Sequence, residues 1–240
     1  MDELANMLER NVRIAERPYD VYLVSQTGER VGAHWDVLAE CSFYFECAIK
    51  TLEEDTKHDV PINHFVPIST DCLKSIVRFS YTENIEDTEE NVLELLAVSD
   101  FLQISRLDEQ CKKLIVACLN SHNWVEVWRF ARKRFADLAE AVMLFVSDNI
   151  SDLVRDRDVQ DLNFEELVEL LVDVPKITED ARAEAIFAWL KRDPEQRVCH
   201  AASQMASIPT IIATHLQDAI RKLCSHNVTT TDKVDLVYNL

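Results

Sequence analysis

Residues 20–45 of the chain have the sequence DVYLVSQTGERVGAHWDVLAECSFYF. The β-branched and aromatic residues at 19–24 predict a strand, and a turn-like segment leads into a second short strand at 30–33. We therefore expect a β-hairpin, followed by one or two helical turns at 34–40. Ser42 has a side chain that favours the N-cap of a further helix. This stretch predicts a small sheet followed directly by helices.

The rest of the chain is predicted to be mainly helical. Two β-like runs at 60–62 and 65–68 are limited by prolines, so we expect edge or short strands there. Beyond them, apolar residues recur at helical spacing. In the turn after the first of these helices, Asn84 is the residue expected to tolerate left-handed backbone geometry. The predicted helices span roughly 69–81, 88–99, 105–120, 122–133, 136–149, 163–172, 178–191 and 195–206.

The pattern changes near residues 120–122 from mixed α/β to all-α. We therefore predict a mainly α protein with a small β-sheet, in which an α+β domain at 1–120 precedes an all-α domain at 121–240. The chain has only two glycines. So few argue against an all-β fold, whose tight hairpin turns need positive φ, and leave almost no Gly-rich phosphate loop to consider.

Charge and composition narrow the partners. The chain carries 43 Asp and Glu against 25 Lys and Arg, a net charge of −18. Proteins that bind nucleic acid gather basic residues against phosphates, so we expect no nucleic-acid partner. The densest basic run, at 129–134, lies within a helical pattern, and we interpret it as a solvated helix face.

The cysteines and the N-terminus indicate a reducing compartment. Seven cysteines occur without a CxxC pair, and no secretory leader or membrane-length apolar stretch is found. We expect no membrane partner and a cytoplasmic protein, with the nucleus as the alternative. Cys111, beside Lys112 and Lys113, is the one thiol with the basic neighbours of a redox sensor.

Three ordered segments carry a resemblance to a known family. Residues 20–45 resemble the BTB (POZ) signature: an Asp-Val strand, a small residue, His, a Leu-Ala pair, then Ser and Tyr-Phe. Residues 79–85 look like the Tyr-Thr-turn-Ile segment of that family, and residues 97–111 resemble its closing stretch, which ends in Cys. The resemblance implies a BTB domain in the N-terminal half.

The C-terminal half resembles a BACK domain, the helical companion of BTB in kelch-like proteins. Residues 185–197 parallel its aliphatic-aromatic, Trp-Leu, Asp, Arg pattern, and residues 138–149 also fit. Asn123-Trp124 stands where the family usually has Asn-Cys. Together the two resemblances imply a kelch-like adaptor of the cullin-3 type, without kelch repeats in this chain.

The resemblance also implies a homodimer. In BTB proteins the first helix typically packs on the partner subunit. The segment 2–14 is predicted to be a short helix with one apolar stripe, which needs a groove to bury it. The alternative is that the stripe packs within its own chain. The four residues of the predicted dimer interface are Leu4, Met7, Leu8 and Val12.

Cullin-binding adaptors of this family resemble one another in a hydrophobic-x-Glu motif, which Leu52-Glu53-Glu54 supplies here. An apolar anchor enters a pocket and the adjacent carboxylate meets basic or amide groups. The run from Ile49 to the motif is one residue shorter than in kelch-like relatives. The first two helices of the second domain form a groove or, alternatively, a bundle core. The predicted cullin-binding residues are Tyr44, Leu52, Glu54, Trp124, Val127 and Trp128.

No catalytic constellation stands out in the sequence. We find no Gly-x-Ser-x-Gly turn, no His-x-x-x-His pair and no Walker-type loop. We therefore predict no enzyme, no cofactor and no metal site. We expect His34 to be a buried, hydrogen-bonded residue and Asp20 to bond nearby backbone or His34. Trp35 is expected to be half-covered on the surface or part of a contact.

The sequence thus predicts a dimeric adaptor that recruits a cullin-3 type ubiquitin ligase to an unknown protein substrate. The alternative is a BTB scaffold in transcriptional or cytoskeletal complexes that does not bind a cullin.

Overall fold

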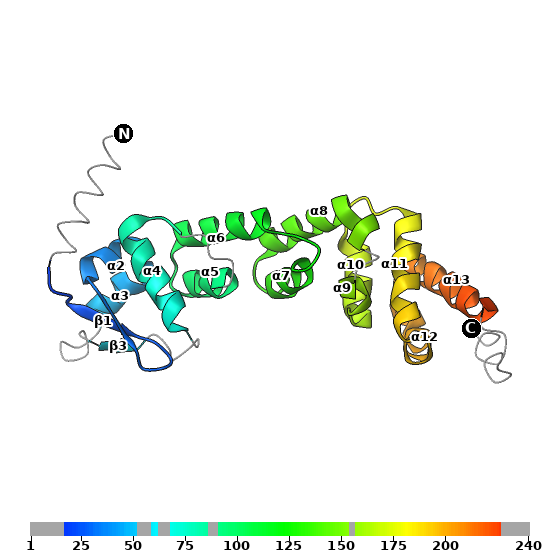
Figure 1. Cartoon of the computed structure of the whole chain (residues 1–240), viewed down its shortest axis with the longest axis horizontal. Coiled ribbons are helices and arrows are strands. Elements are labelled where there is room, and N and C mark those ends of the chain that lie inside the picture. The colour runs from blue at the N-terminus through cyan, green and yellow to red at the C-terminus, as the bar shows by residue number, and fades with distance from the viewer. Residues whose placement is uncertain (1–16, 52–58, 62–67, 86–90, 154–156, 227–240) are drawn as a thin grey trace. The chain divides into compact units, whose positions relative to one another are not determined.

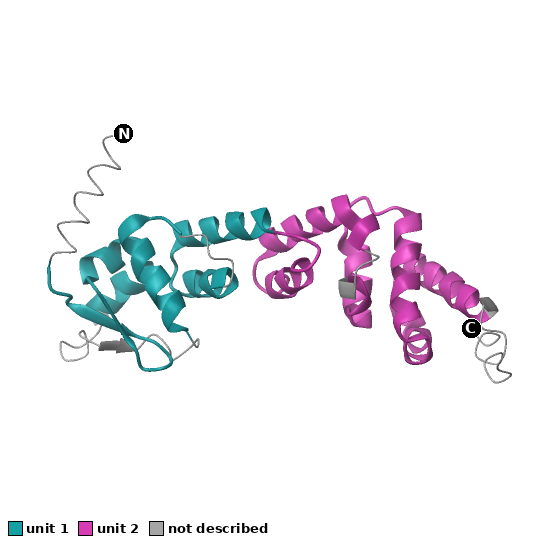
Figure 2. Cartoon of the chain, viewed as in Figure 1, with its two compact units in different colours: residues 1–118 teal, residues 119–240 magenta. Residues whose placement is uncertain are grey.

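The computed structural model describes residues 17–51, 59–61, 68–85, 91–153 and 157–226. The chain forms two compact units, residues 1–118 and 119–240 (Figure 2). The first contains a small sheet with helices and the second contains helices (Figure 1). The predicted fold class, mainly α with a small β-sheet, is confirmed.

The sheet of the first unit has three strands in the order β2-β1-β3. β1 (Val21–Val24) pairs antiparallel with β2 (Arg30–Ala33), as the hairpin prediction requires. β3 (Asp59–Pro61) pairs parallel with β1 at the edge, where a proline is tolerated. The hairpin turn contains Gly28, whose φ of 82° lies in the left-handed region, which a residue without Cβ adopts without strain.

Two helices that pack against each other follow the hairpin. They are α2 (Trp35–Cys41) and α3 (Phe43–Thr51). Between them, Ser42 is buried, and its hydroxyl donates to the Leu102 carbonyl and accepts from the Phe45 N–H at 3.3 Å. The predicted N-cap is thus confirmed, and it also ties α3 to a residue 60 positions away.

Trp35 corrects a prediction. Its side chain is 6% exposed and its ring lies 6.3 Å from that of Phe45, centroid to centroid. It is therefore a core residue of the first unit, neither half-covered nor open for a contact. The helical period places position 35 on the inner face of α2, together with Leu38.

Three more helices complete the first unit. They are α4 (Thr70–Thr82), α5 (Val92–Phe101) and α6 (Ser105–Ala117). Ser69 caps α4 by accepting from the Cys72 N–H.

The left-handed residue after α4 is Glu83, with φ of 53°, and not Asn84. Arg106 pairs with the Glu83 carboxylate, and the Gln110 side chain donates to the Glu83 carbonyl. These two contacts from α6 hold the backbone in a conformation that Asn would adopt more readily on its own.

The second unit is a succession of helices. The five helices predicted between residues 122 and 206 are all found with shifted ends, and a short helix, α9, was not expected. Asn163 and Thr178 cap α10 and α11, as their side chains predict, and Asn163 forms a full capping box with Glu166. The elements are α7 (Trp124–Ala131), α8 (Ala136–Leu153), α9 (Arg157–Gln160), α10 (Phe164–Asp173), α11 (Glu179–Arg192), α12 (Pro194–Ser203), η3 (Met205–Ser207) and α13 (Thr210–His226).

Among the helices that the structure describes, none combines the length and the apolar content needed to cross a bilayer.

Candidate protein-interaction site

His34 contacts residue Arg17, in the segment that precedes β1. His34 is buried, and its Nε2 lies 3.3 Å from the Arg17 carbonyl. Because a carbonyl can only accept, Nε2 carries the proton, and Nδ1 accepts from the Tyr81 hydroxyl at 2.6 Å. Burial raises the pKa of Tyr81 to about 12, which keeps its hydroxyl protonated as the donor. The prediction of a structural histidine is confirmed.

Three further contacts fix residues 17–20. Arg17 binds both carboxylate oxygens of Asp36, at 2.8 and 3.1 Å, and Asp20 accepts from the Trp35 N–H at 2.8 Å, as predicted. The exposed Tyr19 ring lies against Gly32, where a Cβ would come within 2.3 Å of it. The chain that leaves the predicted dimer helix is therefore anchored on the first unit.

The predicted dimer residues Leu4, Met7, Leu8 and Val12 lie outside the described residues. The prediction for this stripe stays a prediction.

Helix α3 presents an aromatic surface at its start. The Phe43 side chain is 59% exposed. Tyr44, one of the predicted cullin-binding residues, is partly exposed, and its ring lies 5.5 Å from that of Phe101. The helix ends at Thr51, immediately before Leu52 and Glu54, which lie outside the described residues.

The other predicted cullin-binding residues lie on α7. Trp124, Val127 and Trp128 are all buried in the second unit. This is the position that the bundle-core alternative describes, so their part in a groove stays a prediction. The Trp124 indole N–H is enclosed and has no acceptor among the residues that the structure describes.

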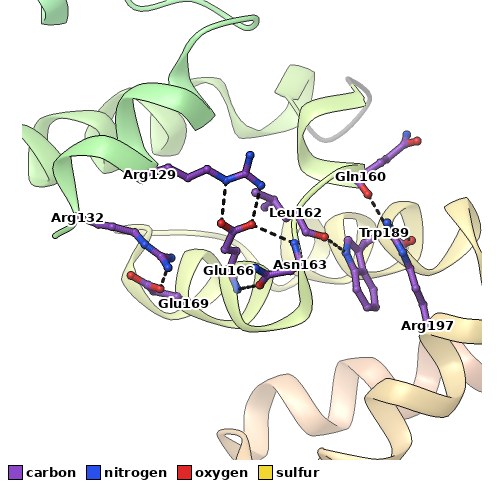
Figure 3. Close-up of polar contacts among 9 residues, drawn as sticks. All are labelled: Arg129, Arg132, Gln160, Leu162, Asn163, Glu166, Glu169, Trp189 and Arg197. Atoms are coloured by element: carbon purple, nitrogen blue, oxygen red, sulfur yellow. Dashed lines mark hydrogen bonds and ion pairs between the residues drawn. The ribbon is translucent and has the colours of Figure 1, made fainter. Parts of the chain in front are cut away.

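A polar network fixes α7 against α10 (Figure 3). Arg129 donates to both carboxylate oxygens of Glu166, at 2.8 and 2.7 Å, and Arg132 donates to Glu169 at 2.6 Å. Hydrogen bonding by Arg129 holds the pKa of Glu166 below its usual value, against the opposing effect of burial. The basic run at 129–134 is therefore not only a solvated face, because two of its arginines bind α10.

A second network surrounds Trp189, a buried residue of α11 (Figure 3). Its indole N–H donates to the Leu162 carbonyl at 2.7 Å. Arg197 of α12 donates to the carbonyls of Gln160 and Trp189, at 2.6 and 2.8 Å, and its guanidinium lies 4.5 Å from the Trp189 ring centroid. The Trp-Leu, Asp, Arg pattern at 185–197 therefore joins α9, α11 and α12 by direct contacts.

The buried cysteines do not have the chemistry of redox sensors. Burial raises the pKa of the Cys111 thiol to about 12 and also raises that of Cys72. Lys112 pairs with Asp108 at 2.9 Å, so its charge is directed to that carboxylate. Over the described ranges, no three His, Cys, Asp or Glu side chains are grouped as a metal site would need.

Sequence reasoning missed the Arg129–Glu166 pair and the residues between α11 and α13 described below. The capping pattern at Asn163 did indicate that Glu166 faces the start of α10. Its partner on α7 is 37 positions away and left no local signal.

Comparison with known proteins gives the family. The family model described as BTB/POZ domain matches residues 11–119, and the one described as BTB And C-terminal Kelch (BACK) matches residues 124–229. Kelch-like protein 21 of Danio rerio is 28% identical over 78% of this chain and 30% of its own length. Kelch-like protein 40 of Xenopus laevis is 28% identical over 82% of this chain and 31% of its own length.

Among solved structures, the BTB domain of zebrafish PATZ1 matches 48% of this chain and 91% of that domain, at 26% identity and a TM-score of 0.39. The chain spans about a third of the length of the curated relatives it matches. The two family models follow one another along the sequence and leave four residues between them. The chain therefore contains a BTB/POZ domain followed by a BACK domain.

Proposed function

We propose that this protein is a dimeric, non-enzymatic adaptor that recruits a cullin-3 type ubiquitin ligase to a protein substrate for ubiquitination. BTB–BACK proteins are an adaptor-type family, typically related to cullin-3, and BTB domains generally dimerise. The kelch-like relatives support the same assignment. The proposal concerns the docking of proteins and needs no cofactor or metal.

The observation that carries the proposal is the position of α3. Its nine residues span about 13 Å at 1.5 Å per residue. Phe43 and Tyr44 stand at its start, and the hydrophobic-x-Glu motif of Leu52 and Glu54 follows its last residue, Thr51. A cullin helix laid along α3 would meet aromatic side chains near one end and an apolar anchor with a carboxylate at the other.

Helix α7 supports the site indirectly in this proposal. Because Trp124, Val127 and Trp128 are buried, they would set the shape of a surface for the cullin's N-terminal arm and would not themselves be its main contacts. The bond between Arg129 and Glu166 keeps α7 in one orientation against α10. A surface that is fixed before binding loses less entropy when the partner docks.

The dimer part of the proposal rests on the anchored segment before β1. Arg17 and Tyr19 are held by Asp36 and Gly32, so the chain leaves the first unit from a fixed point. The predicted stripe of Leu4, Met7, Leu8 and Val12 lies only a few residues upstream. A short amphipathic helix of this kind gains its stability from the surface it packs on, which we assign to the partner subunit.

Titration calorimetry with a cullin-3 N-terminal domain tests the recruitment. We expect micromolar or tighter binding by the wild type. Leu52→Asp with Glu54→Lys should weaken it at least tenfold, because a charge replaces the anchor and the carboxylate is reversed. The matched control is Val172→Asp with Asp173→Lys, which makes the same charge changes at exposed residues of α10 and should leave the affinity unchanged.

The outcomes separate two errors. If the wild type fails to bind at micromolar concentrations, the adaptor proposal is wrong and the scaffold alternative replaces it. If the wild type binds and the motif variant binds equally well, the cullin is recruited through another surface.

A further inference from the structure

Helices α11 and α13 line an open groove of about 460 Å³ in the second unit, called the α11–α13 groove below. The floor is apolar: Ala183 and Phe187 come from α11 and Ala219 from α13. Ala219 is buried and Phe187 is half-buried, so the ring presents part of its surface to the cavity. The volume is within the range of binding pockets, about 300–1,000 Å³, and small alanines at the helix contact leave the space open.

The rim of this groove is acidic. Glu179, Asp180 and Glu184 line it from α11 and Asp218 from α13. The basic side chains in the lining are Lys222 and the titratable His215, both of α13. Neither Glu179 nor Asp180 forms an ion pair with any residue the structure describes. Asp218 pairs with Arg221 at 3.2 Å, but both side chains are exposed and such a pair contributes little. The groove therefore retains a negative potential for a cationic occupant.

The shape of the groove favours a polypeptide over an ion. Glu179 and Phe187 are eight positions apart on one helix, about 12 Å along its axis, which matches about four residues of extended chain. The carboxylates are spread along this length, and the described part of the chain offers no group of three metal-ligating side chains. A nucleic acid would be repelled by the rim.

A second copy of this chain is a poor occupant. Its densest basic run is at 129–134, and there Arg129 and Arg132 are already bound to Glu166 and Glu169. Inserting that run into the groove would require breaking these contacts. The occupant is therefore a different molecule.

We propose that the α11–α13 groove binds a basic segment of a partner protein, with a Lys or Arg side chain between the rim carboxylates and a neighbouring apolar side chain on Phe187. This goes beyond the proposed function, because none of the residues assigned there to cullin binding or dimerisation lines the groove. It gives the BACK domain its own docking surface for a recruited or regulatory protein.

Fluorescence anisotropy with two labelled peptides tests the proposal. The probe is a 12-residue peptide of alternating Lys and Leu, and its twin has Glu in place of every Lys. We expect micromolar binding of the Lys peptide, weakened by salt, and no binding of the Glu twin. Glu179→Gln with Asp180→Asn should weaken the Lys peptide by about five- to tenfold, because two of the four rim charges are lost.

The control is Glu140→Gln with Glu165→Gln, which removes two exposed carboxylates near the starts of α8 and α10. It changes the net charge equally and should alter the affinity less than twofold. A second variant, Phe187→Ala, should weaken the Lys-Leu peptide but not a Lys-Ser peptide, because only the former uses the apolar floor. Circular dichroism melts show whether each variant is folded, and if Phe187→Ala is not, the carboxylate pair alone decides.

Four results would overturn the proposal. They are no binding of the Lys peptide at millimolar concentration, equal losses in the groove and control variants, equal binding of the Glu twin, and displacement of the peptide by an equal charge concentration of spermine. The last would identify the groove as a general cation site.

Discussion

Two acidic helix faces in the second unit have opposite surroundings. On α10, Glu166 pairs with Arg129 of α7, and Glu169 pairs with Arg132, the C-cap residue of α7. At the start of α11, Glu179 and Asp180 border an open groove and have no ion pair among the described residues. All four residues are carboxylates, and Glu166, Glu179 and Asp180 lie in the first turn of their helices, where a negative charge is favourable. The difference shows that an acidic helix start becomes a structural contact only where the facing helix supplies a guanidinium.

The two pairs of carboxylates also differ in burial, and therefore in how much a substitution should cost in folding free energy. The Glu166 side chain is 7% exposed, whereas its partner Arg129 is 45% exposed. A carboxylate that has lost most of its water depends on its partner, so the pair is costly to break from one side. Glu179 and Asp180 keep their water and depend on no partner. We therefore expect substitutions in the two regions to differ strongly in their effect on stability.

The largest expected effect is that of Arg129→Met. It removes the donors of Glu166 and leaves a nearly buried carboxylate without its cation, so unfolding free energy should fall by about 2–3 kcal/mol. Urea unfolding followed by circular dichroism measures the change. In the double variant Arg129→Met with Glu166→Gln, part of the loss should return, because no charge is left unpaired. A double variant less stable than Arg129→Met alone would contradict this account.

The second prediction concerns pH. Hydrogen bonds from Arg129 place the pKa of Glu166 below its usual value in the folded state. Because the folded-state pKa is lowered, the contribution to stability is complete above the unfolded-state pKa, near 4.3, and is lost as pH falls through the folded-state value. The difference in unfolding free energy between wild type and Glu166→Gln should therefore shrink from pH 6 to pH 3. A difference that stays constant over this range would show that the carboxylate is not held ionised.

The parts of this molecule that sequence predicts are local ones. The hairpin and the caps at Ser42, Ser69 and Asn163 follow from turn chemistry and side-chain acceptors a few residues from their partners. Trp35 was wrongly placed because departure from a family pattern says nothing about which helix face a residue occupies. Asn84 was wrongly preferred over the residue before it, because contacts from α6 override the intrinsic preference.

The candidate sites are predictable only in part. The hydrophobic-x-Glu motif and the aromatic start of α3 are continuous in sequence, so a family resemblance can indicate them. The groove combines positions near 180 with positions near 218, and the bond between Arg129 and Glu166 joins residues 37 positions apart. Neither has a spacing rule, because the packing of whole helices brings those residues together.

The smallest expected effect is that of Glu179→Gln with Asp180→Asn on stability. Each removes a charge from the first turn of α11, where it interacts favourably with the helix dipole, but the two like charges also repel one another. These terms oppose, so unfolding free energy should change by no more than about 0.5 kcal/mol, well below the loss in Arg129→Met. The same urea titrations measure it. A loss as large as that of Arg129→Met would mean that the groove carboxylates stabilise the fold as the α10 carboxylates do, and a surface required for folding is less free to serve a partner.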